Sequence, residues 1–230
     1  MTQRSILRIG HRGAAGHAPE NTLAALERGI ALGADFLEVD LQQTRDGRIV
    51  LMHDKFVDRT TNGRGHLADL NWENVRRLDA GSGQRIPLLE EALEAASGRA
   101  GLVLECKVPE IGEELWRRVA DFGFRGPLIF ASFLHREILA IRELDAHAMT
   151  MALIEAIPVT PAAFALEARA THAGIALDSA SPRFVEQLHD AGLQVLVYTA
   201  DTEEQIRMAV ELGVNGIISN YPERIPARVA

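Results

Sequence analysis

The sequence lacks the features that mark disulfide-stabilised, secreted and membrane-spanning proteins. Its 230 residues include a single cysteine, Cys106, so no disulfide can form within the chain. The opening residues 1–8 contain no apolar run before charge returns at Arg8, so no secretory signal is predicted. No uncharged stretch of the second half is longer than 156–166, which is much shorter than the roughly 20 residues of a membrane-spanning helix. We expect a cytoplasmic protein without integral membrane association.

Concentrated positive charge is also missing. The chain has 24 basic and 32 acidic side chains, a net charge of -8, and no block of lysine or arginine. Because affinity for a nucleic-acid backbone depends on clustered cations, no nucleic-acid partner is predicted. A small anionic substrate is not excluded, since a few positioned donors can hold it. The composition does not indicate an oligomeric state.

Short apolar runs alternate with amphipathic stretches along the chain. The nine strand candidates are 6–9, 36–41, 49–52, 102–104, 128–130, 149–154, 174–177, 195–198 and 216–218. Helical periodicity marks 21–32, 88–96, 112–122, 136–144, 182–191 and 203–212. Helix starts are indicated by Asn21, by Ser181 before Pro182, and at residues 201–204. Alternation of this kind predicts parallel strands joined by helical crossovers.

The most consistent fold is a (β/α)8 TIM barrel formed as one domain over residues 1–230. Asp46-Gly47 is a tight-turn signal, so we interpret 48–53 as a hairpin excursion, which leaves eight barrel strands. The alternative is a doubly wound open sheet. Residues 54–87 are polar and glycine-rich and contain no full helix-strand unit. They predict a small insertion after the second strand that caps one end of the barrel.

The second predicted strand carries two acids, Glu38 and Asp40, at alternate positions and therefore on one face. Two carboxylates facing a barrel interior repel each other unless a cation or protonation neutralises them. Ligation by carboxylates alone suits Mg2+ or Ca2+ better than zinc. The alternative is that one acid faces outward at the end of the strand.

Other strand ends carry polar pairs. His11 and Arg12 follow the first strand, Glu105 and Lys107 share a face of the third, and His53 ends the hairpin. Simpler interpretations exist: a histidine bonded to a backbone carbonyl beside a surface arginine, and a local salt bridge. Two histidines beside a metal and two cations are nevertheless the components of acid-base phosphoryl chemistry.

Together these motifs resemble the glycerophosphodiester phosphodiesterase family. The matching motifs are His11-Arg12-Gly13, Pro19-Glu20-Asn21-Thr22, Glu38-Val39-Asp40, His53-Asp54, Glu105-Cys106-Lys107 and Ser132-Phe133. The compact length is most similar to the cytoplasmic bacterial branch. The resemblance implies a (β/α)8 barrel, a divalent cation such as Mg2+ or Ca2+, and hydrolysis of a small glycerophosphodiester to glycerol 3-phosphate and an alcohol.

The resemblance also implies roles for individual residues. It implies Glu38, Asp40 and Glu105 as metal ligands, His11 and His53 as the acid-base pair, Arg12 and Lys107 as phosphate-binding groups, Glu20 near the metal and Asn21 near the substrate. Phe133 and Tyr198 are further candidates for substrate contact. Which histidine is the acid stays open, as does whether water or the glycerol 2-hydroxyl attacks.

The chain departs from the family pattern near its end. The family shows tryptophan, threonine and, two residues further on, asparagine, whereas this chain has Tyr198, Thr199 and Asp201. Asn220 stands where aspartate is common. We expect these positions not to touch the catalytic set and to affect only glycerol or alcohol preference. Cys106 is expected to be a packed thiol.

Two other functions remain as alternatives. A barrel that only binds phosphate would be expected to lose a histidine or a metal acid, and none is lost. A relative acting on lysophospholipids or phosphoinositides would need an apolar or basic rim, and Trp72, Phe133 and Leu134 are too few to decide. We expect residues 54–87 to lie over the barrel mouth and to favour deacylated diesters.

Overall fold

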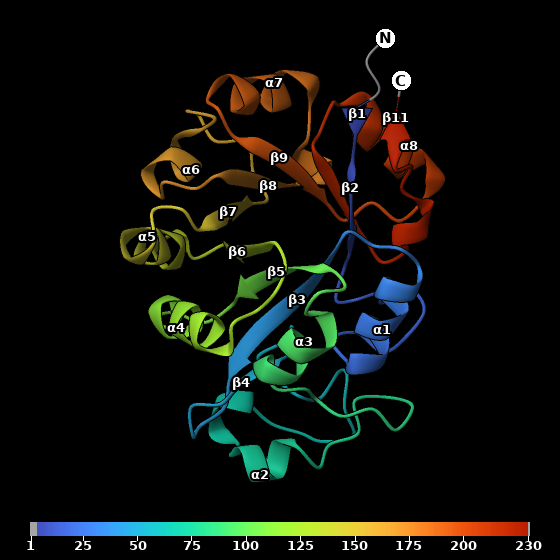
Figure 1. Ribbon diagram of the computed structural model, residues 1–230, viewed down its shortest axis with the longest axis vertical. Coiled ribbons are helices and arrows are strands. Elements are labelled where there is room, and N and C mark those ends of the chain that lie inside the picture. Colours follow the sequence, from blue (N-terminus) through green and yellow to red (C-terminus); the bar gives the residue numbers. More distant parts are fainter. Residues whose placement is uncertain (1–3, 230) are drawn as a thin grey trace.

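The computed structural model describes residues 4–229 and shows a closed ring of parallel strands (Figure 1). The ring strands are β2 (Leu7–Gly10), β3 (Phe36–Gln43), β5 (Gly101–Cys106), β6 (Leu128–Ser132), β7 (Met149–Ile154), β8 (His172–Ala176), β9 (Gln194–Tyr198) and β10 (Gly216–Ser219). Their order is β2-β10-β9-β8-β7-β6-β5-β3, and β2 pairs with β3 to close the ring. The predicted TIM barrel is confirmed, and the open sheet is excluded.

Helices lie around the outside of the strands (Figure 1). They are α1 (Leu23–Ala31), α3 (Leu89–Ala96), α4 (Gly112–Phe122), α5 (His135–Leu144), α6 (Ala163–Glu167), α7 (Pro182–Asp190) and α8 (Glu203–Glu211). Each longer helix has an apolar stripe; α7, for example, buries Phe184, Val185 and Leu188. The sequence did not predict α6, which is only five residues long.

The start of α1 differs from the prediction. Thr22, not Asn21, is the N-cap, and its hydroxyl accepts a hydrogen bond from the backbone of Ala25. Asn21 has a left-handed backbone, with a φ of 56°, and its side chain binds Asp40. Asn21 therefore contacts Asp40, one of the two acids predicted to share a face of the second strand.

The predicted hairpin is present. Strand β4 (Ile49–Leu51) runs antiparallel to β3, and the turn between them contains Gly47 in a left-handed conformation. The following residues, 54–87, include the 3-10 turn η1 (Leu67–Asp69) and the short helix α2 (Trp72–Val75). They enclose a small apolar cluster that includes Val57, Val75 and Ile86. Figure 1 shows α2 beside the barrel, beyond β4 and α3.

The inside of the ring is apolar below the strand ends. Ile9, Phe36, Val103, Leu196 and Ile218 pack there, and all are at least 94% buried. Outside the ring, two larger apolar clusters join the strands to the helices. Polar side chains gather instead where the strands end.

Short elements complete the chain. β1 (Arg4–Ser5) pairs antiparallel with β11 (Arg228–Val229), and 3-10 turns lie at η2 (Leu177–Ser179) and η3 (Pro222–Arg224). The opening residues 1–3 and residue 230 lie outside the described part of the chain. Within 4–229 there is no helix with the length and apolar character needed to cross a bilayer.

Candidate active site

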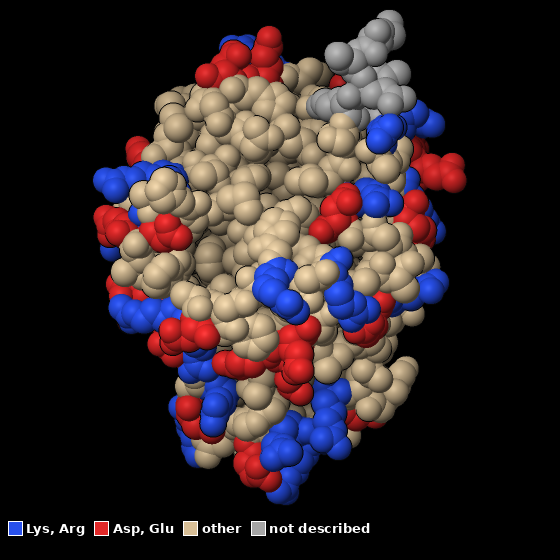
Figure 2. Space-filling view, in the orientation of Figure 1, with Lys and Arg blue, Asp and Glu red and all other residues tan. Residues whose placement is uncertain are grey.

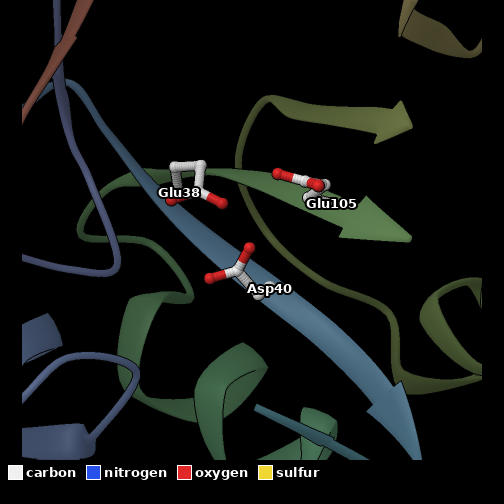
Figure 3. Close-up of side chains that lie close together, drawn as sticks. All are labelled: Glu38, Asp40 and Glu105. Atoms are coloured by element: carbon white, nitrogen blue, oxygen red, sulfur yellow. The ribbon is translucent and has the colours of Figure 1, made fainter. Parts of the chain in front are cut away.

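Three carboxyl groups from two neighbouring strands, β3 and β5, lie close together (Figure 3). Glu38 and Asp40 are alternate residues of β3, and Asp40 pairs in register with Glu105 of β5. One oxygen from each group lies within 4.8 Å of the others. Glu38 and Asp40 are only 4% and 1% exposed. The predicted inward direction of both β3 acids is therefore correct.

The three acids of the cluster are buried and repel one another when ionised, and a bound cation would reduce this repulsion. Burial raises the pKa of Glu38 well above its ordinary value, and Asp40 and Glu105 raise it further. Burial and the charge of Asp40 likewise raise the pKa of Glu105 to about 7. The buried Oε1 of Glu38 has no hydrogen-bond partner among residues 4–229. An unpartnered oxygen within an all-carboxylate donor set fits a hard divalent cation.

Two cations flank the cluster. Lys107 Nζ lies 2.7 Å from Glu105 Oε1 and 3.2 Å from Asp40 Oδ1. Arg12 Nε lies 3.2 Å from Asp40 Oδ2, and the Arg12 backbone N–H donates to Glu38 at 2.9 Å. Burial opposes ionisation of Asp40, but Lys107 and Arg12 outweigh it and lower the pKa of Asp40 below its usual value. The cluster thus contains one acid whose pKa is lowered and two acids whose pKa values are raised.

Asn21 and Glu20 support this arrangement from the loop before α1. Asn21 Nδ2 donates to Asp40 Oδ2 at 2.7 Å, and Asn21 Oδ1 accepts from the Asp40 backbone at 3.1 Å. Glu20 accepts from Arg12 at 2.6 Å and from both terminal nitrogens of Arg59 at 2.8 and 2.9 Å. The structure therefore places Asn21 and Glu20 against the acid and the arginine of the site.

Arg59 is a site neighbour that the sequence did not reveal. It binds Glu20 and also Asp54, with Nε 2.6 Å from Asp54 Oδ2. Asp54 in turn lies 2.7 Å from His53 Nδ1. Arg59 sits in the irregular segment 54–87, where no periodicity indicates which way a side chain points. Only the folded loop brings it to the site.

The two histidines occupy different settings. The His11 side chain follows β2 and is 20% exposed, and its Nε2 lies 3.9 Å from Glu38 Oε2. Burial lowers the pKa of His11, and the neighbouring Arg12 lowers it further. The His53 side chain follows β4 and is 35% exposed. The structure thus places one histidine deep beside the acids and the other nearer to solvent.

A pocket opens beside the acid cluster. His11, Glu38 and Glu105 line one part, and apolar side chains complete it, among them Val103, Ala131, Phe133, Met151, Leu153, Tyr198 and Ile218. The rings of Phe133 and Tyr198 meet edge to face with centroids 6.0 Å apart. The Tyr198 hydroxyl donates to the carbonyl of Ile154 at 3.0 Å. This bond fixes the ring against the pocket wall.

The segment 54–87 does not cover this pocket as expected. None of the described residues that line the pocket belongs to the segment. Its own apolar side chains pack on one another beside β4, so it stands to one side of the mouth. Its contact with the site runs through Arg59 and Glu20.

The chain is similar to known proteins over most of its length. Residues 11–224 match the model of the glycerophosphoryl diester phosphodiesterase family. The chain belongs to this family. A glycerophosphodiester phosphodiesterase of Caldanaerobacter subterraneus is 34% identical, with 94% of this chain and 95% of the relative covered. One of Bacillus subtilis is 31% identical, with 95% and 84% covered.

Solved structures of the family share the fold. An Oleispira antarctica phosphodiesterase in complex with the product sn-glycerol-3-phosphate superimposes with a TM-score of 0.89 at 28% identity, covering 96% of this chain and 95% of that one. A glycerophosphodiester phosphodiesterase of Agrobacterium tumefaciens gives a TM-score of 0.82 at 27% identity, covering 95% and 98%. The likeness extends over almost the whole barrel.

One expectation about the departures from the family pattern was wrong. Asn220 does touch the predicted catalytic set, because its Oδ1 lies 2.8 Å from His11 Nδ1. The two residues are 209 positions apart in the sequence. They meet because β10 lies next to β2 when the ring closes. The other departure, Asp201, binds Asn220 directly.

Cys106 lies between two site residues but outside the site. Its side chain belongs to the apolar cluster between β5 and the helices and is 2% exposed. Burial raises the pKa of the thiol to about 12. The predicted packed thiol is confirmed, and the alternation of β5 explains why Glu105 and Lys107 point the other way.

Proposed function

We propose that the chain hydrolyses small glycerophosphodiesters to glycerol 3-phosphate and an alcohol, with a divalent cation, Mg2+ or Ca2+, held by Glu38, Asp40 and Glu105. The observation that carries the proposal is the buried cluster of three carboxyl groups, with an unpartnered oxygen on Glu38. Membership of the family supports it. The similar Oleispira protein, whose structure contains sn-glycerol-3-phosphate, supports the nature of the product.

The cations of the site bind the phosphodiester in this proposal. When bound, the metal ion neutralises charge on the phosphate and stabilises the charge that grows on its oxygens. Arg12 offers a planar pair of donors, and Lys107 offers a point charge. Both are already oriented by Asp40. Glu20 and Asn21 act through these groups, by fixing the Arg12 guanidinium and the Asp40 carboxylate.

The histidines move protons. One removes a proton from the attacking nucleophile, which is water or the glycerol 2-hydroxyl, and the other gives a proton to the departing alkoxide, so His11 and His53 act as an acid-base pair. His11 Nε2 faces Glu38 beside the pocket. His53 is oriented by Asp54, which binds its Nδ1. The substrate carbon atoms then pack on the wall that contains Phe133 and Tyr198.

The same proposal covers the setting of the protein. We place it in the cytoplasm, as one domain with residues 54–87 as an insertion, acting on a small-molecule substrate and not on nucleic acid. The net charge of -8 agrees with this choice of partner.

The test is to incubate the purified protein with glycerophosphocholine and Mg2+ or Ca2+ and to follow the products by 31P NMR. We expect glycerol 3-phosphate and choline. Asn74→Ala, at an exposed position of α2, is a control that should behave as wild type. Release of phosphocholine and glycerol would overturn the proposal because it is cleavage on the other side of phosphorus, and absence of turnover would also overturn it.

A second substrate class has an observation in its favour. Several large apolar side chains are exposed on the loops that follow β6 and β7: Phe133 is 40%, Leu134 38% and Ile157 59% exposed. An apolar rim of this kind suits a lysophospholipid. The pocket beside the acids is small, however, so we rank this activity second.

A further inference from the structure

A chain of hydrogen bonds connects His11, which follows β2, to residues that follow β9 and β10. Asp201, which follows β9, accepts from Asn220 Nδ2 at 2.6 Å and from the Asn220 backbone N–H at 2.8 Å. Asn220, which follows β10, lies with its Oδ1 2.8 Å from His11 Nδ1. We propose that Asp201 and Asn220 are positioning residues that hold His11 with its proton on Nδ1 and a bare Nε2 facing the acid cluster. The inference deepens the proposed function and rests on it for the role of His11.

Donor and acceptor chemistry fixes the direction of every bond in this chain. An ionised carboxylate can only accept, so the Asn220 atom that faces Asp201 must be the NH2 group. The amide oxygen therefore faces His11 and can only accept. It follows that His11 Nδ1 is the donor and carries the proton. In the neutral ring the proton is then absent from Nε2.

The Asp201 end of the chain is itself anchored. The Ser219 hydroxyl donates to Asp201 Oδ1 at 3.1 Å, and Arg224 donates to the Asp201 carbonyl at 2.7 Å. The Asn220 carbonyl accepts from the backbone of Gly16 at 3.1 Å. With both oxygens of Asp201 occupied, the Asn220 amide cannot turn over without losing the bond from its NH2 group.

A backbone hydrogen bond also fixes the position of His11 relative to β10. The His11 N–H donates to the carbonyl of Ser219 at 2.8 Å, which ties the ends of β2 and β10 together. His11 Nε2 then lies 3.9 Å from Glu38 Oε2, beyond hydrogen-bond distance. The bare nitrogen therefore points into the site and is free to accept a proton there.

His53 has no such arrangement and provides the comparison. Its Nδ1 lies 2.7 Å from Asp54, the next residue in the chain. Asp54 is shared with Arg59, which comes from the irregular segment 54–87. The tautomer of His53 thus depends on one neighbouring carboxylate, whereas that of His11 depends on two residues distant in sequence.

The experiment measures the tautomer directly in the Mg2+-loaded protein. Two-bond 1H–15N NMR at about pH 8, where an ordinary imidazole is neutral, separates a protonated ring nitrogen from a bare one, and His11→Gln identifies the His11 signals. We expect wild type to show the Nδ1-protonated form. Asn220→Ala should give a mixture of both forms, lower kcat about tenfold or more, and leave KM within about threefold.

A reciprocal exchange is the sharpest variant. In Asp201→Asn with Asn220→Asp, the new amide can donate to the new carboxylate, and that carboxylate can accept from His11 Nδ1. The double variant should regain the Nδ1-protonated form and most of kcat, while Asp201→Asn alone should not. Thermal unfolding checks that every variant is folded, and Asn74→Ala is the matched control.

The outcomes separate the inference from the proposed function. If folded Asn220→Ala keeps both the single tautomer and the wild-type kcat, the positioning role is wrong. If wild type shows Nε2 protonated, it is also wrong. If the tautomer follows the variants as expected but no glycerophosphodiester is hydrolysed, the positioning role stands and the proposed function falls.

Discussion

The two sides of the barrel mouth differ in kind. The charged arc consists of Arg12, Glu38, Asp40, Glu105 and Lys107, which lie on β3 and β5 or directly after β2 and β5. The apolar arc consists of Phe133, Leu134, Leu153, Ile157 and Tyr198, at the ends of β6, β7 and β9. Figure 2 shows a broad uncharged area over β6 to β9.

The charged and the apolar side chains of the mouth thus come from different groups of strands. Three neighbouring strands suffice to place three acids, two cations and His11, because adjacent parallel strands lie within a few ångströms of each other. The opposite strands contribute mainly surface and space. Changes in the charged arc should affect turnover, and changes in the apolar arc should affect which alcohol is released.

The largest effect on hydrolysis should come from removal of the divalent cation. Removing divalent cations by exhaustive chelation should reduce the hydrolysis of glycerophosphocholine to background, because three carboxyl groups would otherwise face a negative substrate. Addition of Mg2+ or Ca2+ should restore it. Elemental analysis confirms the metal-free state. Full activity in verified metal-free protein would show that the charged arc does not need a metal ion for hydrolysis.

The histidines should follow. His11→Ala and His53→Ala should each lower kcat by about a hundredfold or more, the usual contribution of general acid-base catalysis. Steady-state kinetics and a thermal melt measure turnover and folding separately. His147→Ala, at an exposed position after α5, is the matched control. A variant of either site histidine with near wild-type turnover would show that this histidine is structural.

A smaller effect is expected for Arg12→Lys. Arginine reaches Glu20 and Asp40 at once with two nitrogens of one plane, and lysine offers a single ammonium group. We expect kcat/KM to fall by roughly tenfold. Arg99→Lys, at an exposed ion pair with Glu27, serves as the control. Unchanged efficiency would show that a simple countercharge is enough at position 12.

The smallest effect concerns the apolar arc. Glycerophosphocholine should be preferred over lysophosphatidylcholine below its micelle concentration, because each acyl CH2 contributes about 0.8 kcal/mol only where it is covered. Phe133→Ala should change the ratio of the two efficiencies by only a few-fold, since the side chain is already 40% exposed. A clear preference for the acylated substrate would assign the apolar arc to acyl chains and favour the lysophospholipid activity.

Much of the fold could be predicted because it depends on local periodicity. Alternating apolar residues and helical stripes identified every strand of the ring, and the Asp46-Gly47 turn identified the hairpin. Strand ends were less accurate: β5 spans Gly101–Cys106, against a predicted 102–104. Helix α6 was missed because five residues are too few to show a helical period.

The site was predictable where it follows from strand alternation and not where it depends on ring closure. Glu38 with Asp40, and Glu105 with Lys107, share faces that the sequence displays. Asn220 meets His11 only through a tertiary contact. The same holds for residues 54–87, whose irregular sequence does not specify on which side of the mouth they pack.

The seam between β10 and β2 also has a consequence for the order of folding. The acids of β3 and β5 are at most 67 residues apart, whereas His11 and Asn220 are 209 residues apart, and a contact between more distant residues requires closure of a longer loop. The acid cluster can therefore assemble while the ring is still open. A refolding chain would assemble the acid cluster first and the contact between His11 and Asn220 last, so recovery of turnover would report the closing of the barrel.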